Sequence, residues 1–186
     1  MPDQSQLPTT QWPAKPSSMR ALSIAAIIVG ALLLLVGMLF VWWVALTDHP
    51  GEAPTPPELA GLPRTAVITG PTAVTAIHQL HNSQFPLRSG AVAQYGRQNE
   101  ITLWVAGAPL TFMAQRMVDV MEEQIQKGET PFQPLATRAI GGRTIFEVSG
   151  LGQRHFYFRS GLLVIWIAVN DDLAEDALSE LLMFYP

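Results

Sequence analysis

The residues with the most chemical potential lie near the C-terminus, in segments that alternate like strands of a sheet. The set comprises Arg143, Glu147, His155, Tyr157, Arg159 and Trp166. Guanidinium and imidazole groups form charge-assisted hydrogen bonds with carboxylates and phosphates. If the set shares one sheet face, it can bind an anionic group or the carboxylates of a partner.

The length of the first turn decides which of these side chains meet. A three-residue loop at Gly150–Gly152 places Glu147 opposite His155 and Arg143 opposite Arg159. Like charges that face each other are unfavourable unless an acid or anion lies between them. In the predicted register, an anion or a carboxylate of a partner between the two arginines would relieve this repulsion.

The second turn extends the same face. A two-residue turn at Ser160-Gly161 places His155 opposite Trp166 as well. Side chains alternate between the faces of a strand, so a slip of one residue would divide the set. An ordinary polar sheet face with cross-strand pairs accounts for the same residues and is the simpler interpretation.

Other candidate ligands are sparse, and we expect no metal or cofactor. His78 and His81 stand at helical spacing, but two imidazoles without a third ligand are too few for a defined zinc site. Three thioethers at four-residue spacing, Met113, Met117 and Met121, suit Cu(I), although methionines on such a stripe more often fill a core. Without an activated serine or a close carboxylate pair, we expect a protein that is not an enzyme.

Residues 65–186 have the pattern of one α+β domain. Three amphipathic helices are predicted, at about 70–80, 109–127 and 171–184. Six strands are predicted: Ala91–Gly96, Glu100–Gly107, Leu135–Ile140, Arg143–Ser149, Gln153–Arg159 and Leu162–Val169. The last strand has eight apolar residues in a row, which is typical of a strand buried on both faces. We therefore expect a mainly antiparallel sheet covered by helices on both faces, or by a partner on one.

The order of these elements resembles that of the α/β/α sandwich of PsbP- and Mog1-like domains. The resemblance covers about the last 120 residues and concerns element order alone. Since folds host many functions, it implies no activity.

Residues 21–47 contain no charged side chain and predict a single transmembrane helix. Such a helix is about 40 Å long at 1.5 Å per residue, which exceeds a bilayer core of about 30 Å. The alternative is a cleaved signal peptide, whose apolar region is shorter, at about 7–15 residues. Ala26, Gly30 and Gly37 fall on one stripe of the helix and would allow a second helix to approach closely, although small residues are common in membrane helices anyway.

The flanks of this helix predict its orientation. Lys15 and Arg20 precede it, whereas acidic residues follow it, so the positive-inside rule places the N-terminus in the cytoplasm. Residues 1–20 are polar and rich in proline, which is typical of a disordered cytoplasmic tail. Residues 48–64 contain five prolines and predict a semi-rigid stalk before an extracytoplasmic domain.

Composition narrows the function class. The net charge of −4 without a basic run argues against nucleic acid, and the absence of cysteine excludes disulfides and thiolate metal sites. We expect a non-catalytic, membrane-anchored accessory or interaction domain, as a subunit of a larger membrane complex. Its partners would be the lipid bilayer and either a membrane protein or a second copy bound through the helix. The alternative is a ligand-binding or sensor domain that uses the face carrying Arg143, His155 and Arg159.

Overall fold

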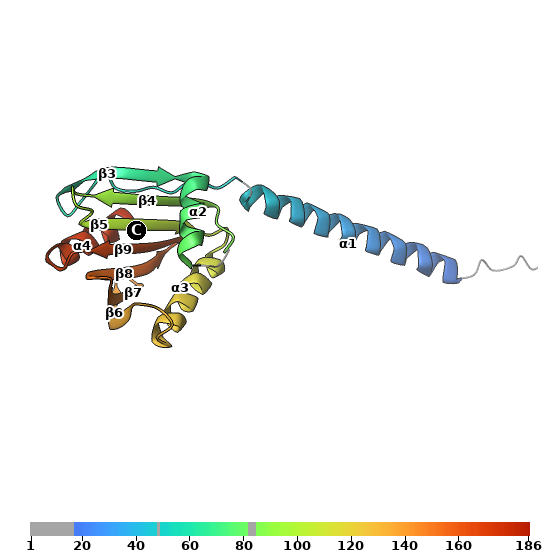
Figure 1. Ribbon diagram of the computed structural model, residues 1–186. Helices are drawn as coiled ribbons and strands as arrows, with labels where there is room; N and C mark the ends of the chain where they lie inside the picture. The colour runs from blue at the N-terminus through green and yellow to red at the C-terminus, as the bar shows by residue number, and fades with distance from the viewer. Residues whose placement is uncertain (1–16, 48, 82–84) are drawn as a thin grey trace, which may run out of the picture. The chain divides into compact units, whose positions relative to one another are not determined.

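The computed structural model describes residues 17–47, 49–81 and 85–186 (Figure 1). The chain divides into two compact units between Trp42 and Trp43. The first unit consists of most of one long helix, and the second is a folded α+β domain, which we call the folded domain.

The long helix α1 runs from Ser17 to Thr47. Its segment Leu22–Ala45 has 24 residues, is long and apolar enough to cross a membrane, and buries none of its side chains in the protein. The helix predicted over 21–47 is therefore present, and it begins four residues earlier, within the predicted tail. Residues 1–16 of that tail lie outside the described part of the chain.

The described residues of the folded domain form one sheet of nine strands, with the order β2-β3-β4-β5-β9-β8-β7-β6 and β1 beside β4. The strands are Gly51–Glu52 (β1), Glu58–Leu59 (β2), Leu62–Thr69 (β3), Ser89–Tyr95 (β4), Ile101–Gly107 (β5), Gln133–Ile140 (β6), Arg143–Gly150 (β7), Gln153–Ser160 (β8) and Leu163–Val169 (β9). Every pairing is antiparallel except that of β1 with β4. The six predicted strands are present with ends within two residues, but the predicted number is wrong because β1, β2 and β3 were missed.

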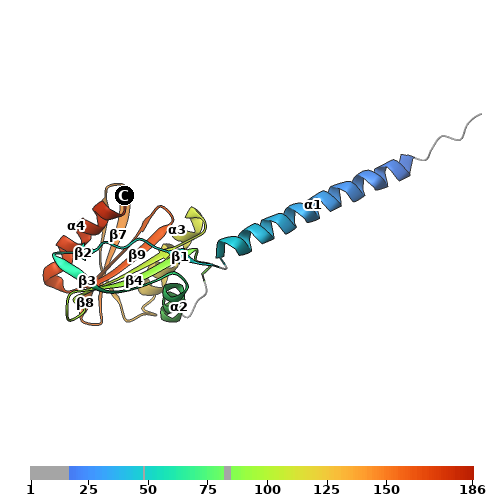
Figure 2. The ribbon, with the colours of Figure 1, turned by 90° about the horizontal axis from the view of Figure 1, so that it is seen from above.

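Helices cover both faces of this sheet, as Figures 1 and 2 show. Helices α2 (Gly70–His81) and α3 (Thr111–Gln126) pack on one face, which we call the α3 side. A short 3-10 turn, η1 (Asp171–Leu173), leads into α4 (Ala174–Phe184), which packs on the other face, the α4 side. The sheet therefore lies between two apolar cores, in agreement with the predicted arrangement.

Strand β9 belongs to both cores. Ile165 and Ile167 are fully buried on the α4 side, while Val164 and Trp166 pack on the α3 side. The strand also lies between β5 and β8, so its backbone is paired along both edges. This position explains its unbroken apolar sequence, because no side chain of a strand covered on both faces points to water.

The segment predicted as a stalk is part of the folded domain instead. It contains β1 and β2, and Ala53 and Leu59 are 4% and 1% exposed in the core on the α4 side. Its polar contact with α4 is a hydrogen bond of 2.8 Å from the backbone N–H of Ala60 to the Glu180 carboxylate. Residues 51–64 thus pack against the domain and do not extend away from it.

Two tyrosines donate hydrogen bonds to the backbone carbonyls of prolines in this segment. The Tyr95 hydroxyl donates to the C=O of Pro56 at 2.9 Å, and the Tyr185 hydroxyl donates to the C=O of Pro54 at 2.7 Å. Proline has no N–H for a sheet ladder, but its carbonyl accepts a hydrogen bond like any other. A proline-rich segment can therefore be packed on a domain by side-chain donors, which the composition alone does not reveal.

Leu59→Ala should lower the free energy of unfolding by about 2–5 kcal/mol, because it removes a fully buried side chain and leaves a cavity. Glu58→Ala, one residue earlier and exposed, should change it by less than about 0.5 kcal/mol. Urea denaturation of the two variants measures the difference. Equal effects would mean that residues 51–64 do not belong to the core.

Candidate functional site

The turn between β7 and β8 is one residue shorter than predicted. Gly150 pairs with Gln153, so Leu151 and Gly152 form a two-residue turn. Both have positive φ, at 54° and 82°, which is the backbone of the type I′ turn that joins twisted hairpin strands. The prediction that Glu147 faces His155 is therefore wrong: His155 pairs with Val148.

This slip places the two predicted arginines on opposite faces. Arg143 lies on the α4 side and donates to the carbonyls of Leu182, at 2.9 Å, and Tyr185 at the end of α4. Arg159 lies on the α3 side and donates to Gln115 Oε1 of α3 at 2.9 Å. The predicted anion between two facing arginines is therefore excluded, and each guanidinium instead attaches a helix to the sheet.

The pairing of β8 with β9 is shifted by two residues from the prediction. Because side chains alternate between the faces with a period of two, this shift leaves each side chain on its predicted face. Ser160 pairs with Leu163, and Tyr157, not His155, is the direct partner of Trp166. His155 and Trp166 are now diagonal neighbours on the α3 side, and Trp166 Nε1 donates to His155 Nδ1 at 3.1 Å. The predicted proximity of these two side chains is thus correct, although the register is not.

His155 is 3% exposed, and both of its ring nitrogens are engaged. Since Nδ1 accepts from Trp166, Nε2 carries the proton and donates to the C=O of Gly150 at 3.0 Å. Burial lowers the pKa of this imidazole from its ordinary value, and the bond to Gly150 opposes that shift only in part. His155 is therefore a neutral structural group, with no nitrogen left for a metal or a substrate proton.

An array of aromatic rings crosses the α3 side of the sheet. Tyr157 stacks between Phe146, at 4.8 Å, and Trp166, at 5.0 Å, with planes inclined by 8° in both pairs. Phe132, from the loop before β6, packs its ring 5.1 Å from Trp166 and 4.8 Å from His155. Burial raises the pKa of the Tyr157 hydroxyl well above its ordinary value, so it stays protonated.

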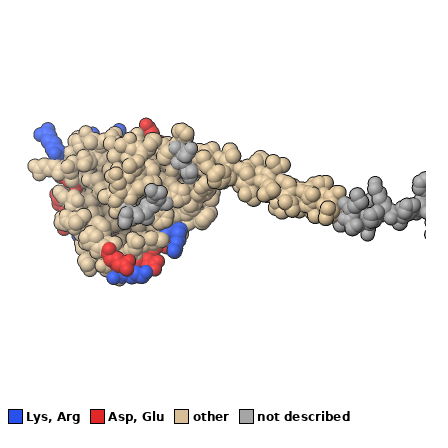
Figure 3. Space-filling view, turned by 45° about the vertical axis from the view of Figure 1, so that its right-hand side comes forward, with Lys and Arg blue, Asp and Glu red and all other residues tan. Residues whose placement is uncertain are grey.

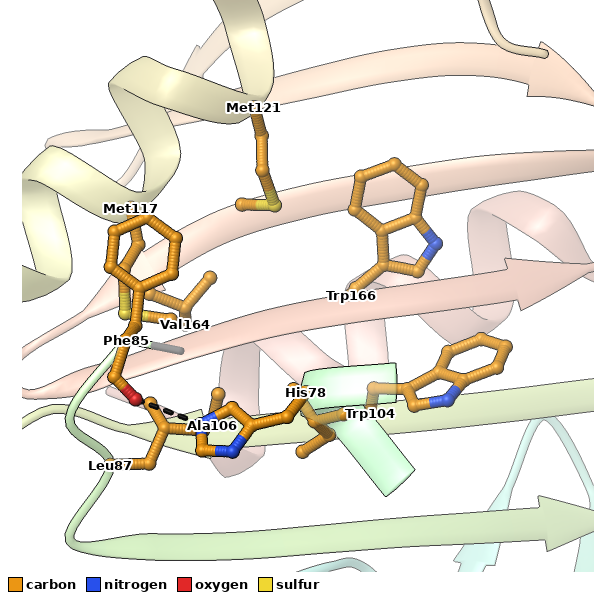
Figure 4. Close-up of a pocket in the computed structure, with 10 residues that line it drawn as sticks. His78, Phe85, Leu87, Trp104, Ala106, Met117, Met121, Val164 and Trp166 are labelled. Carbon is orange, nitrogen blue, oxygen red and sulfur yellow. Dashed lines mark hydrogen bonds between the residues drawn. The ribbon is translucent and has the colours of Figure 1, made fainter. Parts of the chain in front are cut away.

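Trp166 continues this array into an apolar cleft between α2 and α3 (Figure 4). Trp104, its partner on β5, shares the floor, and Met117 and Met121 of α3 form one wall. The cavity volume is about 40 Å³, whereas sites for small molecules usually exceed about 300 Å³. The cleft is therefore a shallow apolar surface.

The other candidate ligands have structural roles in this cleft. His78 lines it, and its Nε2 lies 2.8 Å from the C=O of Phe85. His81 is the last residue of α2, and its side chain lies outside the described part of the chain. Met117 is 7% exposed and packs in the core with its two neighbours on the stripe. Within the described ranges, no three His, Cys, Asp or Glu side chains are grouped closely enough to hold a metal ion.

Glu147 belongs to a charged cluster on the α4 side that the sequence did not reveal. It is 6% exposed and forms ion pairs with Arg138 of β6 and, at 3.3 Å, with Arg154 of β8. Arg138 also contacts Glu175 of α4 at 2.8 Å, and Arg154 contacts Asp171 at 3.0 Å. These partners are up to 37 residues apart in the chain, so only the fold brings them together.

The ion pairs of this cluster shift its pKa values in the stabilising direction. Hydrogen bonds from Arg138 lower the pKa of the Glu175 carboxyl, and the two carboxylates raise that of Arg138 further. Each charge therefore has an opposite partner within the protein. The arrangement fastens the start of α4 to three strands and is suited to structure rather than to reaction chemistry.

On the long helix, the predicted small-residue stripe is open. Ala26 and Gly37 are exposed and Gly30 is half-buried. A Cβ added at either glycine would meet no described atom within 4 Å, so the side of another helix could approach there. The pairing of helices through this stripe remains a prediction.

Charged side chains are unevenly distributed over the folded domain. Figure 3 shows acidic and basic groups along the rim of the domain, with the largest group at its lower end and few charges in the middle of that face.

Comparison with known proteins found no matching protein family, no matching curated protein and no matching solved structure. The similarity in element order to PsbP- and Mog1-like domains therefore has no support from the structural comparison.

Because native His155 has a lowered pKa, the unfolded chain takes up its proton first as the pH falls. Stability should therefore be full above about pH 6.5, the pKa of unfolded histidine, and should decrease toward about pH 5. His155→Gln should remove this part of the pH dependence, while His78→Gln should retain it. Urea midpoints at both pH values test this, and identical pH dependence in wild type and His155→Gln would contradict a buried neutral His155.

Proposed function

We propose that this protein is a membrane-anchored interaction domain, held at the bilayer by α1 as a non-catalytic accessory subunit. The observation that carries the proposal is the apolar segment Leu22–Ala45, none of whose residues is buried inside the protein. Fifteen residues of the uncharged segment are Leu, Ile, Val or Phe, each worth roughly −0.3 to −0.6 kcal/mol near a bilayer centre. Insertion is thus favoured by several kcal/mol.

The same segment is also compatible with a signal sequence, since such sequences lie near an N-terminus and are apolar. Its 24 residues favour an anchor, because the apolar region of a signal peptide spans only about 7–15. Lys15 and Arg20 before the helix favour a cytoplasmic N-terminus and an extracytoplasmic domain.

The bonding of the polar residues supports interaction over catalysis. His155 and Glu147 each have their polar atoms engaged inside the protein, and both arginines of the predicted face bind helices. Recognition of an anion at that face is not retained, because it requires Arg143 and Arg159 on one side of the sheet. The apolar cleft between α2 and α3 remains, and exposed apolar surface of this kind contacts other proteins.

Two arginines in the centre of α1, Leu33→Arg with Leu34→Arg, should abolish membrane anchoring, because each costs roughly 2.5–3.5 kcal/mol at that depth. The control, Leu80→Arg with Leu151→Arg, places the same charges on exposed positions of the folded domain and should remain anchored. Extraction of membranes with alkaline carbonate measures the retained fraction. Wild-type protein recovered in the soluble fraction without its first 47 residues would identify a signal sequence and refute the anchor.

Orientation can be tested with single cysteines, since the natural chain has none. Leu151→Cys lies on a turn that is 75% exposed and should react with a membrane-impermeant maleimide in intact cells. Ser5→Cys should react only after lysis, because it precedes the positive flank. The reverse labelling pattern would place the folded domain in the cytoplasm.

A further inference from the structure

Strand β3 forms an edge of the sheet that is covered over only part of its length. Strand β2 pairs with Leu62 and Pro63, but no described strand lies beside Thr65–Thr69 on the outer edge. Figure 1 shows β3 as the outermost long strand of the sheet. The side chains of Val67 and Ile68 are 41% and 40% exposed, on opposite faces of the strand. This stretch therefore offers an unused strand edge flanked by apolar side chains.

The direction of the backbone groups follows from the partner strand β4. The C=O of Gly90 accepts from Ala53, and that of Gln94 accepts from the Thr65 hydroxyl, so even-numbered residues of β4 point toward this edge. Their partners on β3, Ala66 opposite Gln94 and Ile68 opposite Val92, turn their backbone groups inward. Val67 and Thr69 consequently direct their N–H and C=O groups away from the sheet.

The opposite edge of the sheet is protected, and this contrast is informative. Strand β6 carries Pro134, an irregularity between Pro134 and Ala136, and the charged Arg138, which are features that block strand addition. On β3, the single irregularity precedes Ala66, and the residues from Ala66 to Thr69 include no proline and no charge. The single charged residue within β3, Arg64, is turned aside by hydrogen bonds to Thr55.

We propose that this edge binds a second copy of the chain, through antiparallel pairing of β3 with β3 about a two-fold axis at Val67. In this pairing Val67 faces Val67, the small Ala66 faces the large Ile68, and Thr65 faces Thr69. Threonine pairs and paired β-branched residues stabilise antiparallel strands. Because Ala66 of each copy faces Ile68 of the other, each small side chain meets a large one, and the segment complements itself as a two-fold interface requires.

A neutral hollow beside this edge fits the same occupant. It has a volume of about 430 Å³ and lies between Ile68 and helix α2. Its other lining residues are Pro71, Thr72, Thr75, Ala76 and Gln79. Ile68 of the second copy would lie next to Ala66, on the side of the sheet that carries this hollow. Because the lining carries no charge, it favours an apolar or hydroxyl-bearing strand over a charged peptide.

The inference rests on the proposed function in one respect. Two copies tethered in one membrane have a raised effective concentration, which favours a modest interface formed mainly by two strands. The pairing itself depends only on the folded domain.

The test uses Val67→Cys in the full chain in native membranes, where the absence of other cysteines makes the product unambiguous. Facing residues of antiparallel strands bring Cα atoms to about 5.5 Å, within the range of a disulfide. Mild oxidation should convert most of the chain to a disulfide-linked dimer. Leu151→Cys and Leu135→Cys, exposed by 75% and 53%, are the controls for random collision and should remain monomeric.

A second variant separates pairing from folding. Val67→Pro removes an N–H that points away from β4, so the melting temperature should stay nearly unchanged. The same change removes a hydrogen bond between the two copies and should abolish the dimer. Crosslinking with an amine-reactive reagent detects this dimer. Equal disulfide formation at positions 67, 135 and 151 would overturn the proposal, as would a dimer that survives Val67→Pro. A dimer lost instead in Gly30→Ile with Gly37→Ile would assign association to α1. Membrane retention of the Val67 variants keeps failure of the pairing distinct from failure of the anchor.

Discussion

The coverage of β9 on both faces is the constraint on which the folded domain depends. Val164 and Trp166 require an apolar layer on one side, and Ile165 and Ile167 require another on the other side. One layer is supplied by α2 and α3. The other is supplied by α4 together with the segment that carries Leu59. Each cover is fastened by polar contacts at its rim, such as those of Arg159 and Arg143 with the helices. Since burial is the dominant favourable term in folding, these polar contacts mainly determine where each cover lies.

The apolar pattern of the sequence was sufficient to predict this layered architecture. It was not sufficient to predict the register of the strands. An eight-residue apolar run and three amphipathic stripes suffice to indicate a sheet between helices. The face on which each polar residue lies depends on the lengths of the turns. The errors in the two predicted turns had different consequences. At β7–β8 a slip of one residue separated Glu147 from His155, while at β8–β9 a slip of two residues kept His155 beside Trp166. The first error arose because Leu151, a non-glycine residue, adopts positive φ in a two-residue turn.

The boundary of the folded domain was misjudged for a different physical reason. Proline suggests an extended, solvated chain because it lacks an N–H, yet the carbonyls of Pro54 and Pro56 are acceptors for two tyrosines. The tyrosines lie in β4 and just after α4, more than 35 residues away, so no local pattern could connect them to the prolines. Glu175 lies 37 residues from Arg138, so no local pattern could place it in the same cluster as Glu147. Long-range polar contacts are products of the fold, and the local sequence carries little information about them.

The contrast between the two edges of the sheet follows from the same logic. A buried polar group whose hydrogen bonds are made inside the protein does not require a partner from another molecule. His155 and Glu147 are both groups of this kind. An edge strand is different, because half of its backbone groups point outward whatever its sequence. Sequence can only discourage pairing there, and β6 does so with Pro134 and Arg138. Over residues 66–69 of β3 no such protection is present, so within the described part of the folded domain this is where the chain is most open to another strand.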